Sequence, residues 1–295
     1  MFRVRRLLAP FVLCIALLFS EAQAFTIAWL SDTQNYHNAY KPIFDGMTQW
    51  IADNRAALDI RFVFHTGDVV GRWSSEDQWR QARESMGILS NASIPFLTVC
   101  GNHDIGYRMN YANFLKYVLS LRPASMSQEY GDTGSRYELF SANGRDYIFM
   151  GIAFSNKGPS EDEVNWINGV LRQYSSRDAI IITHSYLKKS AAYTTQGKAI
   201  FEKIVKANPN VFLVLCGHCR DISYKNVQLD DDGDGDPDRT VYAILSNFQG
   251  SKAGGGGYMR ILDFRDSDIY IYTYSPYYYS CEYPKGKTEA TVPLP

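Results

Sequence analysis

The amino-acid sequence predicts an α/β fold in which two packed sheets carry helices on their outer faces. Short apolar runs alternate with segments of helical periodicity between residues 26 and 215. Hairpin patterns interrupt this alternation at residues 137–152 and follow it after Arg220. Strand–helix alternation followed by hairpins favours two sheets packed together. No internal repeat and no interdomain linker is visible, so a chain of this length is expected to form one large core.

Five apolar runs predict strands, and each of them ends at a polar cluster. Their Val, Ile, Phe and Leu residues are typical of buried strands, and the flanking polar residues mark where each strand stops. The runs cover residues 26–30, 62–64, 96–99, 179–182 and 211–215.

Three amphipathic helices are predicted between these strands, because apolar residues recur at three- and four-residue intervals. Ser74-Ser75 before the second helix and Gly158-Pro159-Ser160 before the third are typical of helix starts. The apolar faces comprise Ile43, Met47, Trp50 and Ile51; Trp79, Ala82, Met86 and Leu89; and Val164, Ile167, Leu171 and Tyr174.

Antiparallel strands are predicted in two further regions. Residues 137–140 and 147–152 flank Asn143-Gly144, a dipeptide favoured in tight hairpin turns. After Arg220, antiparallel strands are expected near residues 241–245, 258–264 and 269–274. The tyrosine-rich tail, residues 277–295, is expected to pack over the domain.

The first 24 residues have the pattern of a secretory signal peptide. A basic start with three arginines precedes the apolar run Leu7–Phe19, and Ala22-Gln23-Ala24 is a small-residue cleavage site. The apolar run is too short to span a membrane comfortably, which argues against a membrane anchor. We therefore predict export, to the periplasm or the medium, after cleavage near Ala24, and a domain covering residues 25–276.

Charge excludes two classes of partner. Removing the predicted signal peptide lowers the 30 basic and 31 acidic side chains of the chain to 27 and 30. This balance provides no basic surface for nucleic acid and no polybasic patch for a membrane. No later segment has the length of a transmembrane span, and the sequence does not determine the oligomeric state.

Four cysteines follow the predicted signal peptide, which contains Cys14. An even number in an oxidising compartment permits disulfides, with three possible pairings. Cys216 and Cys219 have the spacing of a dithiol oxidoreductase, but they end a strand instead of opening a helix. We expect a structural disulfide instead, either Cys219 with Cys281 or Cys216 with Cys100.

The polar clusters after the five strands supply metal-ligand side chains. Asp32 and Gln34 lie two residues apart, so they can point to the same side past a strand end. Asp68 follows Gly67, and its carboxylate can bridge two cations. The other candidate ligands are Asn102, His184 and His218. A mixed nitrogen and oxygen set suits Zn, Fe or Mn better than Ca.

Each cluster by itself is weak evidence of a metal site, since Asp-x-Gln and Gly-Asp are ordinarily turns. Gly101-Asn102-His103-Asp104 is the most specific of them. The histidines strengthen the combination, because we do not expect histidines that merely fill a core to concentrate at strand ends. All five histidines lie within a few residues of these strand ends: His37, His65, His103, His184 and His218.

The ordered series Asp-x, Gly-Asp, Gly-Asn-His-Asp, His and Gly-His resembles the calcineurin-like metallophosphoesterase superfamily. The resemblance spans residues 26–275, and the start Ser31-Asp32-Thr33-Gln34 is similar to a bacterial-type branch. It implies a four-layered α/β/β/α sandwich of two mixed sheets flanked by helices. It also implies a dinuclear metal site, in which Asp68 would bridge the two cations.

The resemblance further assigns roles to individual residues. Asn102, His184 and His218 would complete the first cation position with Asp68. Asp32 and Gln34 would belong to the second cation position, again with Asp68. His103 would face the substrate as a general acid or phosphate stabiliser, and Asp104 would orient the His103 imidazole.

Two residues depart from the family pattern, both at the second cation position. Gln34 stands where the family commonly has a histidine, and Arg220 stands where it has a second one. An arginine cannot ligate a cation. Three interpretations remain open: a second cation that is weak or absent, Arg220 acting as a fixed charge on phosphate, or a relative that binds without turnover.

An acidic segment before residue 241 resembles a calcium-binding loop. Its carboxylates fall at loop positions 1, 3, 5, 7 and 9, with Gly235 at position 6. Val241 occupies position 12, where a bidentate Glu is expected, so a solvated hairpin tip is an equal alternative to weak Ca²⁺ binding. The carboxylates are Asp230, Asp232, Asp234, Asp236 and Asp238.

The sequence thus predicts an exported metal-dependent hydrolase of phosphoric esters that uses metal-activated water. It would hold one or two divalent ions of Zn, Fe or Mn, with Arg220 among the catalytic candidates. The alternative is a non-catalytic phosphate- or metal-binding protein of the same fold.

Overall fold

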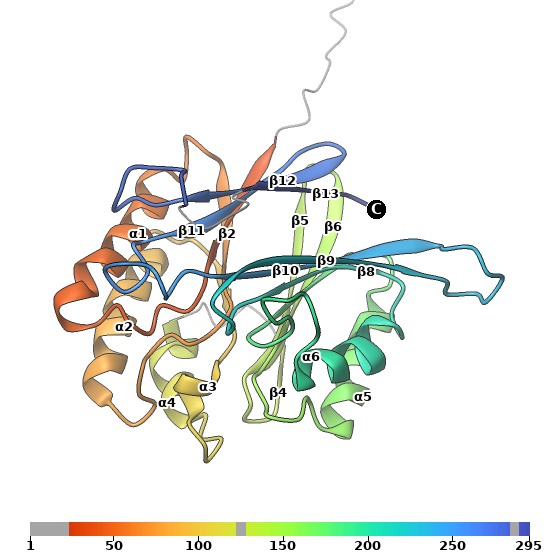
Figure 1. Ribbon diagram of the computed structural model, residues 1–295, viewed down its shortest axis with the longest axis horizontal. Coiled ribbons are helices and arrows are strands. Elements are labelled where there is room, and N and C mark those ends of the chain that lie inside the picture. Colours follow the sequence, from red (N-terminus) through yellow and green to blue (C-terminus); the bar gives the residue numbers. More distant parts are fainter. Residues whose placement is uncertain (1–23, 122–127, 284–288) are drawn as a thin grey trace, which may run out of the picture.

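The computed structural model describes residues 24–121, 128–283 and 289–295, and it confirms the predicted α/β architecture. Two mixed sheets pack face to face, and helices cover the outer face of each, which gives four layers (Figure 1). The predicted signal peptide, apart from Ala24, lies outside the described residues. In the described part of the chain, no helix has both the length and the apolar character that crossing a membrane requires.

The first sheet has six strands, and three of them are parallel. The order is β13 (Glu289–Pro293), β12 (Asp268–Tyr274), β11 (Met259–Phe264), β1 (Phe25–Leu30), β2 (Ile60–His65) and β3 (Phe96–Thr98). β1, β2 and β3 are parallel, so their carboxyl ends meet at one edge of the sheet. β11, β12 and β13 pair antiparallel.

The second sheet has seven strands, and four of them are parallel. The order is β4 (Gln128–Tyr130), β5 (Ser135–Ala142), β6 (Arg145–Ile152), β7 (Asp178–Thr183), β8 (Val211–Cys216), β10 (Arg239–Asn247) and β9 (Asp221–Leu229). β5 and β6 form the predicted hairpin, and Asn143 and Gly144 both have positive φ, as a tight primed turn requires.

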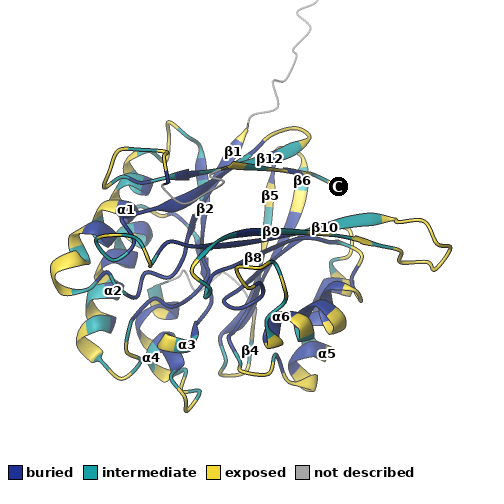
Figure 2. Ribbon diagram, in the orientation of Figure 1, coloured by how far each residue is buried: buried dark blue, intermediate teal, exposed yellow. Residues whose placement is uncertain are grey.

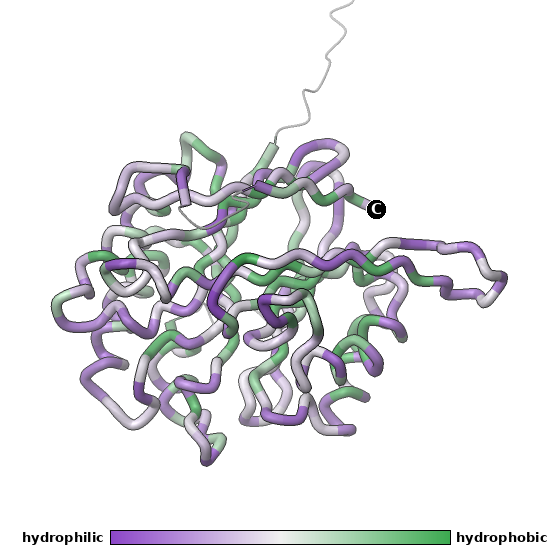
Figure 3. Tube along the Cα trace, viewed as in Figure 1, coloured by the Kyte–Doolittle hydropathy of each residue, from purple (hydrophilic) through white to green (hydrophobic). Residues whose placement is uncertain are grey.

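The expectation of purely antiparallel pairing after Arg220 is only partly right. β10 pairs antiparallel with β9, but it runs parallel to β8 on its other side. The sequence pattern missed β9, whose residues are only partly buried because it is the edge strand. The β9–β10 hairpin projects beyond the body of the molecule, where its hydrophilic residues face solvent (Figures 1 and 3).

The three predicted helices are confirmed as α1 (Lys41–Asp53), α2 (Glu76–Asn91) and α5 (Glu161–Gln173). The hydroxyl of Ser75 caps α2 by accepting from the Gln78 amide, and Ser160 caps α5 in the same way. Shorter elements not foreseen are η1 (Asn38–Tyr40), α3 (Asn102–Ile105), α4 (Ala112–Tyr117), η2 (Leu119–Leu121), α6 (Thr195–Ile200) and the π-helical η3 (Phe201–Val205).

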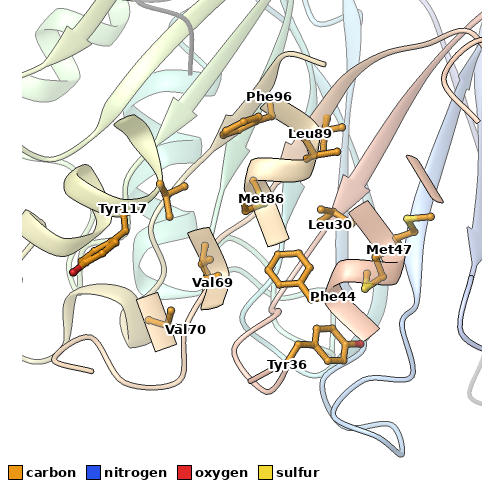
Figure 4. Packing of buried hydrophobic residues seen from close by; sticks show 14 of the residues in the cluster. Leu30, Tyr36, Phe44, Met47, Val69, Val70, Met86, Leu89, Phe96 and Tyr117 are labelled. Carbon is orange, nitrogen blue, oxygen red and sulfur yellow. The ribbon is translucent and has the colours of Figure 1, made fainter. Parts of the chain in front are cut away.

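Three apolar clusters fill the spaces between the four layers. Between the sheets, the Phe149 ring lies 5.0 Å from the Phe62 ring and 4.9 Å from the Phe64 ring, edge to face. Outside the first sheet, Phe44 of α1 and Met86 of α2 pack in one cluster (Figure 4). Outside the second sheet, α5, α6 and η3 contribute the third cluster. The strands are therefore mostly buried, whereas the helices expose their outer faces (Figure 2).

The expected disulfides do not form, because the four cysteines of the described residues are free. Cys100 follows a strand of the first sheet, and Cys216 ends a strand of the second, where its sulfur accepts from the Leu187 amide at 3.5 Å. Cys281 is exposed and Cys219 is half-buried. Burial raises the pKa of Cys216 to about 12, so this thiol is not poised for dithiol exchange.

Candidate metal centre

The carboxyl ends of parallel strands from both sheets meet at one place. The first sheet contributes the loops after β1, β2 and β3, and the second contributes the loops after β7 and β8. Backbone hydrogen bonds join neighbouring loops, from the Asp32 amide to the Gly67 carbonyl (3.1 Å) and from the Gly217 amide to the His184 carbonyl (3.0 Å). Side chains that are distant in sequence therefore converge at a junction between the sheets.

Four predicted ligands form a tight cluster at this junction. Nε2 of His184 lies 3.1 Å from Oδ1 of Asn102 and 3.1 Å from Nδ1 of His218. The same nitrogen lies 3.4 Å from Oδ2 of Asp68. Asp68, His184 and His218 can all offer one ligand atom within a single small volume. These separations match ligand atoms that surround one ion at about 2.0–2.2 Å.

The hydrogen bonds of His184 show that this cluster needs a positive charge. Its Nδ1 donates to the Thr66 carbonyl at 2.8 Å, so in the neutral ring Nε2 carries a lone pair. That lone pair faces the oxygens of Asn102 and Asp68, and only a proton or a metal ion resolves the contact. Burial by itself would lower the pKa of His184, but the carboxylates of Asp68 and Asp32 raise it to about 9. The residues present therefore fit a divalent cation.

Three ligand-bearing residues have strained backbones. Asp32 (φ 52°), Asp68 (φ 55°) and His218 (φ 71°) lie in the left-handed region, which non-glycine residues rarely adopt. Such conformations cost about 1–3 kcal/mol each and concentrate at functional sites. Close packing accompanies the strain, since a methyl group on Gly101 would lie 2.2 Å from Oδ1 of Asp68.

Asp32 lies beside this cluster but outside its tight group. Its carboxylate accepts from the Ser31 hydroxyl and from the His218 backbone amide, at 3.2 Å to each oxygen. Burial raises the pKa of Asp32 to about 7, opposed by the charge of His184 and assisted by that of Asp68. The Asp32 carboxylate is thus linked to the His218 loop through the backbone.

Gln34 contacts Asp68 through its side-chain amide. Its amide nitrogen donates to Oδ2 of Asp68 at 3.2 Å and to Oε1 of Gln249 at 2.7 Å. Its own Oε1 is buried and has no hydrogen-bond partner among the described residues. An unpaired buried amide oxygen on a residue that contacts Asp68 is a suitable ligand for a second cation. Sequence reasoning missed Gln249, which carries no motif.

His103 is exposed at the start of α3, as expected of a residue that faces a substrate. Its backbone amide donates to Oδ1 of Asp68 at 2.9 Å, which places it directly against the first cation position. Its Nδ1 donates to the Gly71 carbonyl at 3.0 Å. Nε2 is therefore the ring atom left to meet a ligand.

Asp104 does not orient His103, contrary to the prediction. Its two oxygens accept from the backbone amides of Val70 (3.0 Å) and Gly101 (2.8 Å). The buried carboxylate therefore ties the loop after β2 to the start of α3. It acts on His103 only indirectly, by fixing the loop that contains Gly71.

Arg220 lies at the edge of this centre, two residues after His218. It is exposed and makes no hydrogen bond or ion pair within the described chain. Its side chain lies beside Gly250, where a methyl group would lie 3.4 Å from Cδ of Arg220. The guanidinium group is thus available to an anion but does not enter the cluster.

His65 corrects the expectation that these histidines avoid the core. It is fully buried, with Nδ1 accepting from the Gly67 amide (3.1 Å) and Nε2 paired with the Thr33 hydroxyl (2.9 Å). Both ring nitrogens are occupied, so His65 is a structural link between the loops after β1 and β2. The sequence marked His65 only as a strand-end histidine and carried no signal of this role.

The acidic loop brings together only part of its carboxylate set. Asp230, Asp232 and Asp238 can each offer an oxygen within a small volume, and all three are exposed. The structure does not place Asp234 or Asp236 in that group. Calcium binding by this loop stays a prediction beside the solvated hairpin tip.

Comparisons with known proteins show what this chain is similar to. The sequence model of the family described as calcineurin-like phosphoesterase matches residues 25–219. YvnB, an uncharacterized protein of Bacillus subtilis (strain 168), is 40% identical over 281 residues, which cover 92% of this chain and 22% of the relative. The chain thus spans about a fifth of the length of this relative.

Two solved structures share the fold. A dimetal phosphatase of Danio rerio aligns with a TM-score of 0.63 and 14% identity, covering 91% of this chain and 98% of its own. The purple acid phosphatase PPD1 from seeds of yellow lupin (Lupinus luteus) aligns with a TM-score of 0.60 and 12% identity, covering 92% of this chain and 54% of its own. At these identities the likeness shows the fold alone.

Proposed function

The chain belongs to the calcineurin-like phosphoesterase family, and on this premise we propose that it hydrolyses phosphoric esters outside the cytoplasm. The observation that carries the proposal is the convergence of Asp68, Asn102, His184 and His218 on one point, with lone pairs facing one another. A bound divalent cation supplies Lewis-acid charge and a water of lowered pKa. Zn, Fe or Mn suits this mixed ligand set, and the second cation position has only oxygen donors.

His103 is the residue proposed to handle the proton. Gly71 fixes the ring by accepting from Nδ1, so Nε2 can hold a proton and give it to a leaving oxygen, or stabilise a phosphoryl oxygen by donating to it. Its exposed position lets a substrate approach. The backbone bond from His103 to Asp68 keeps this imidazole at a fixed place relative to the first cation position.

Export is proposed from the first 24 residues, whose basic start, apolar run and cleavage site have the pattern of a signal peptide. The proposal expects the exported protein to begin near Phe25. An exported form that still carries Leu7–Phe19 at its N-terminus would contradict it.

Hydrolysis is tested with aryl phosphate mono- and diesters in the presence of Mn²⁺ or Zn²⁺. We expect turnover that falls at least about 100-fold in Asp68→Ala and Asn102→Ala, because each removes a ligand of the first cation. Gly87→Ala is a matched control, since nothing lies within 4 Å of the added methyl group on α2. No turnover with any metal at any pH would leave the non-catalytic phosphate- or metal-binding alternative.

Arg220 is proposed to contact a phosphate oxygen of the substrate. Its free guanidinium lies at the edge of the site, where a charge-assisted hydrogen bond is worth about 1.5–3 kcal/mol. Arg220→His is therefore expected to lower kcat/KM by about 10- to 100-fold without improving metal binding. A variant that instead gains a tighter second ion and higher activity would show that Arg220 merely replaced a ligand.

A further inference from the structure

The turn after β10 contacts both residues that depart from the family pattern. Oε1 of Gln249 accepts from the amide nitrogen of Gln34 at 2.7 Å. The next residue, Gly250, packs against the side chain of Arg220. Two adjacent residues of one turn therefore contact the two substituted residues. Gln249 lies 215 residues after Gln34, and Gly250 lies about 30 residues after Arg220.

Two hydrogen bonds hold the backbone of Gln249 in place. Its backbone amide donates to Oδ1 of Asn247 at 2.9 Å, and its carbonyl accepts from Nδ2 of Asn35 at 3.3 Å. The buried Asn247 also donates to the His218 carbonyl at 3.0 Å. Gln249 is thus tied to the loop of Gln34 on one side and to the loop of His218 on the other.

These contacts decide which end of the Gln34 amide is nitrogen. The two N–H groups of that amide meet two acceptors, Asp68 and Gln249, so the oxygen must point elsewhere. That oxygen is buried and unpaired within the described chain. A buried carbonyl without a partner costs about 1–3 kcal/mol. A cation beside it would remove this cost, and amide oxygens are ordinary ligands of hard cations.

We propose that Gln249 is a positioning residue that holds the Gln34 amide with its oxygen toward the second cation position. The inference rests on the proposed function, because it concerns the same metal centre. Without the acceptor at position 249, the amide is free to turn. It then presents its nitrogen, which is not a ligand, in place of its oxygen.

The test counts Mn²⁺ bound per chain by equilibrium dialysis and elemental analysis, over a range of free Mn²⁺. The wild type is expected to bind one ion tightly and a second more weakly. Gln249→Leu is expected to weaken the second ion by about 10- to 100-fold and to leave the first unchanged, as losses of supporting residues usually do. Gln249→Glu retains the acceptor oxygen and is expected to keep the second ion.

Gly250→Ala is the matched control, because it alters the same turn without touching Gln34 and its methyl group fits at ordinary contact distance. It is expected to bind both ions as the wild type does. Equal second-ion affinity in the wild type and Gln249→Leu would overturn the inference, as would a wild type that binds only one ion. Because ion counting needs no turnover, two bound ions without hydrolysis would refute only the proposed function.

Discussion

At the residue scale, the histidines of the strand ends divide into two chemical types. Nδ1 of His184 donates to the Thr66 carbonyl, and its Nε2 faces the ligand cluster. In His65, both ring nitrogens form hydrogen bonds with neighbouring loops. The residue type is the same, and the hydrogen-bond partners decide the role. A histidine whose two ring nitrogens are both paired inside the protein cannot bind a metal without losing one of those bonds.

His65 gives the metal-free protein a pH-dependent stability. Burial, with the charge of His184, lowers the pKa of His65 to about 3, and the unfolded value is about 6.5. Between these values the unfolded chain binds a proton that the folded chain does not. The stabilisation is therefore complete above pH 6.5 and is lost, by about 1.4 kcal/mol per pH unit, as the pH falls towards 3.

His65→Asn removes the titrating ring and keeps an acceptor for the Gly67 amide. The variant is expected to be less stable than the wild type at pH 7.5, with a gap that narrows as the pH falls from 6.5 to 4. Urea unfolding in the presence of a chelator measures both free energies. A gap that stays constant over this range would contradict the assignment of His65 as a buried neutral link.

At the element scale, the strand-end loops pack so closely that glycine is required beside the carboxylates. A methyl group on Gly101 would lie 2.2 Å from Asp68, and one on Gly217 would lie 2.2 Å from Asp32. The Asp68 and Asp32 side chains cannot swing away from such short contacts, because backbone amides hold their carboxylates in place. The glycines therefore set where each carboxylate stands.

Two glycine variants should separate the cation positions. Gly101→Ala displaces Asp68, which both positions share, so affinity for both ions is expected to fall at least about 100-fold. A methyl group on Gly217 would press on Asp32 and Ser31, so the second ion is expected to weaken more than the first. Isothermal titration with Mn²⁺ measures both, with Gly87→Ala as control. Loss of the first ion in Gly217→Ala would mean that Asp32 also supports the first position.

At the scale of the whole molecule, the first cation position joins the two sheets. Asp68 and Asn102 follow strands of the first sheet, and His184 and His218 follow strands of the second. An ion held by all four is a cross-link between the layers. Because the unfolded chain does not assemble this site, the ion stabilises the folded state as a unit.

Removing the ion should therefore destabilise the entire domain. Binding at 1,000 times the Kd contributes about 4.1 kcal/mol, which corresponds to roughly 10 °C in Tm for a chain of this size. Calorimetry with and without chelator is expected to show one transition that shifts by this amount. His184→Ala should abolish the shift, and His37→Ala, outside the cluster, should keep it. A shift that survives in His184→Ala would place the stabilising ion elsewhere.

The architecture and most of the candidate ligands could be predicted from the amino-acid sequence alone. Side chains alternate along a strand and rotate around a helix, which gives apolar residues periods of two and 3.6. These local patterns were enough to predict α1, α2, α5 and the main strands. Metal-ligand residues at strand ends can be recognised in the sequence, because only a few residue types can bind a cation. Asp68, His184 and His218 are examples that the structure brings together.

Which neighbour each side chain meets depends instead on how the folded loops pack together. Gln249 carries no motif, and its bond to Gln34 exists because β10 and β1 end at the same junction of the two sheets. Asp104 holds Val70 and Gly101 instead of His103, and His65 bridges two loops, because loop packing sets these distances. The four cysteines of the described residues likewise remain unpaired. Side-chain partners depend on contacts between segments far apart in the chain, and no local pattern encodes them.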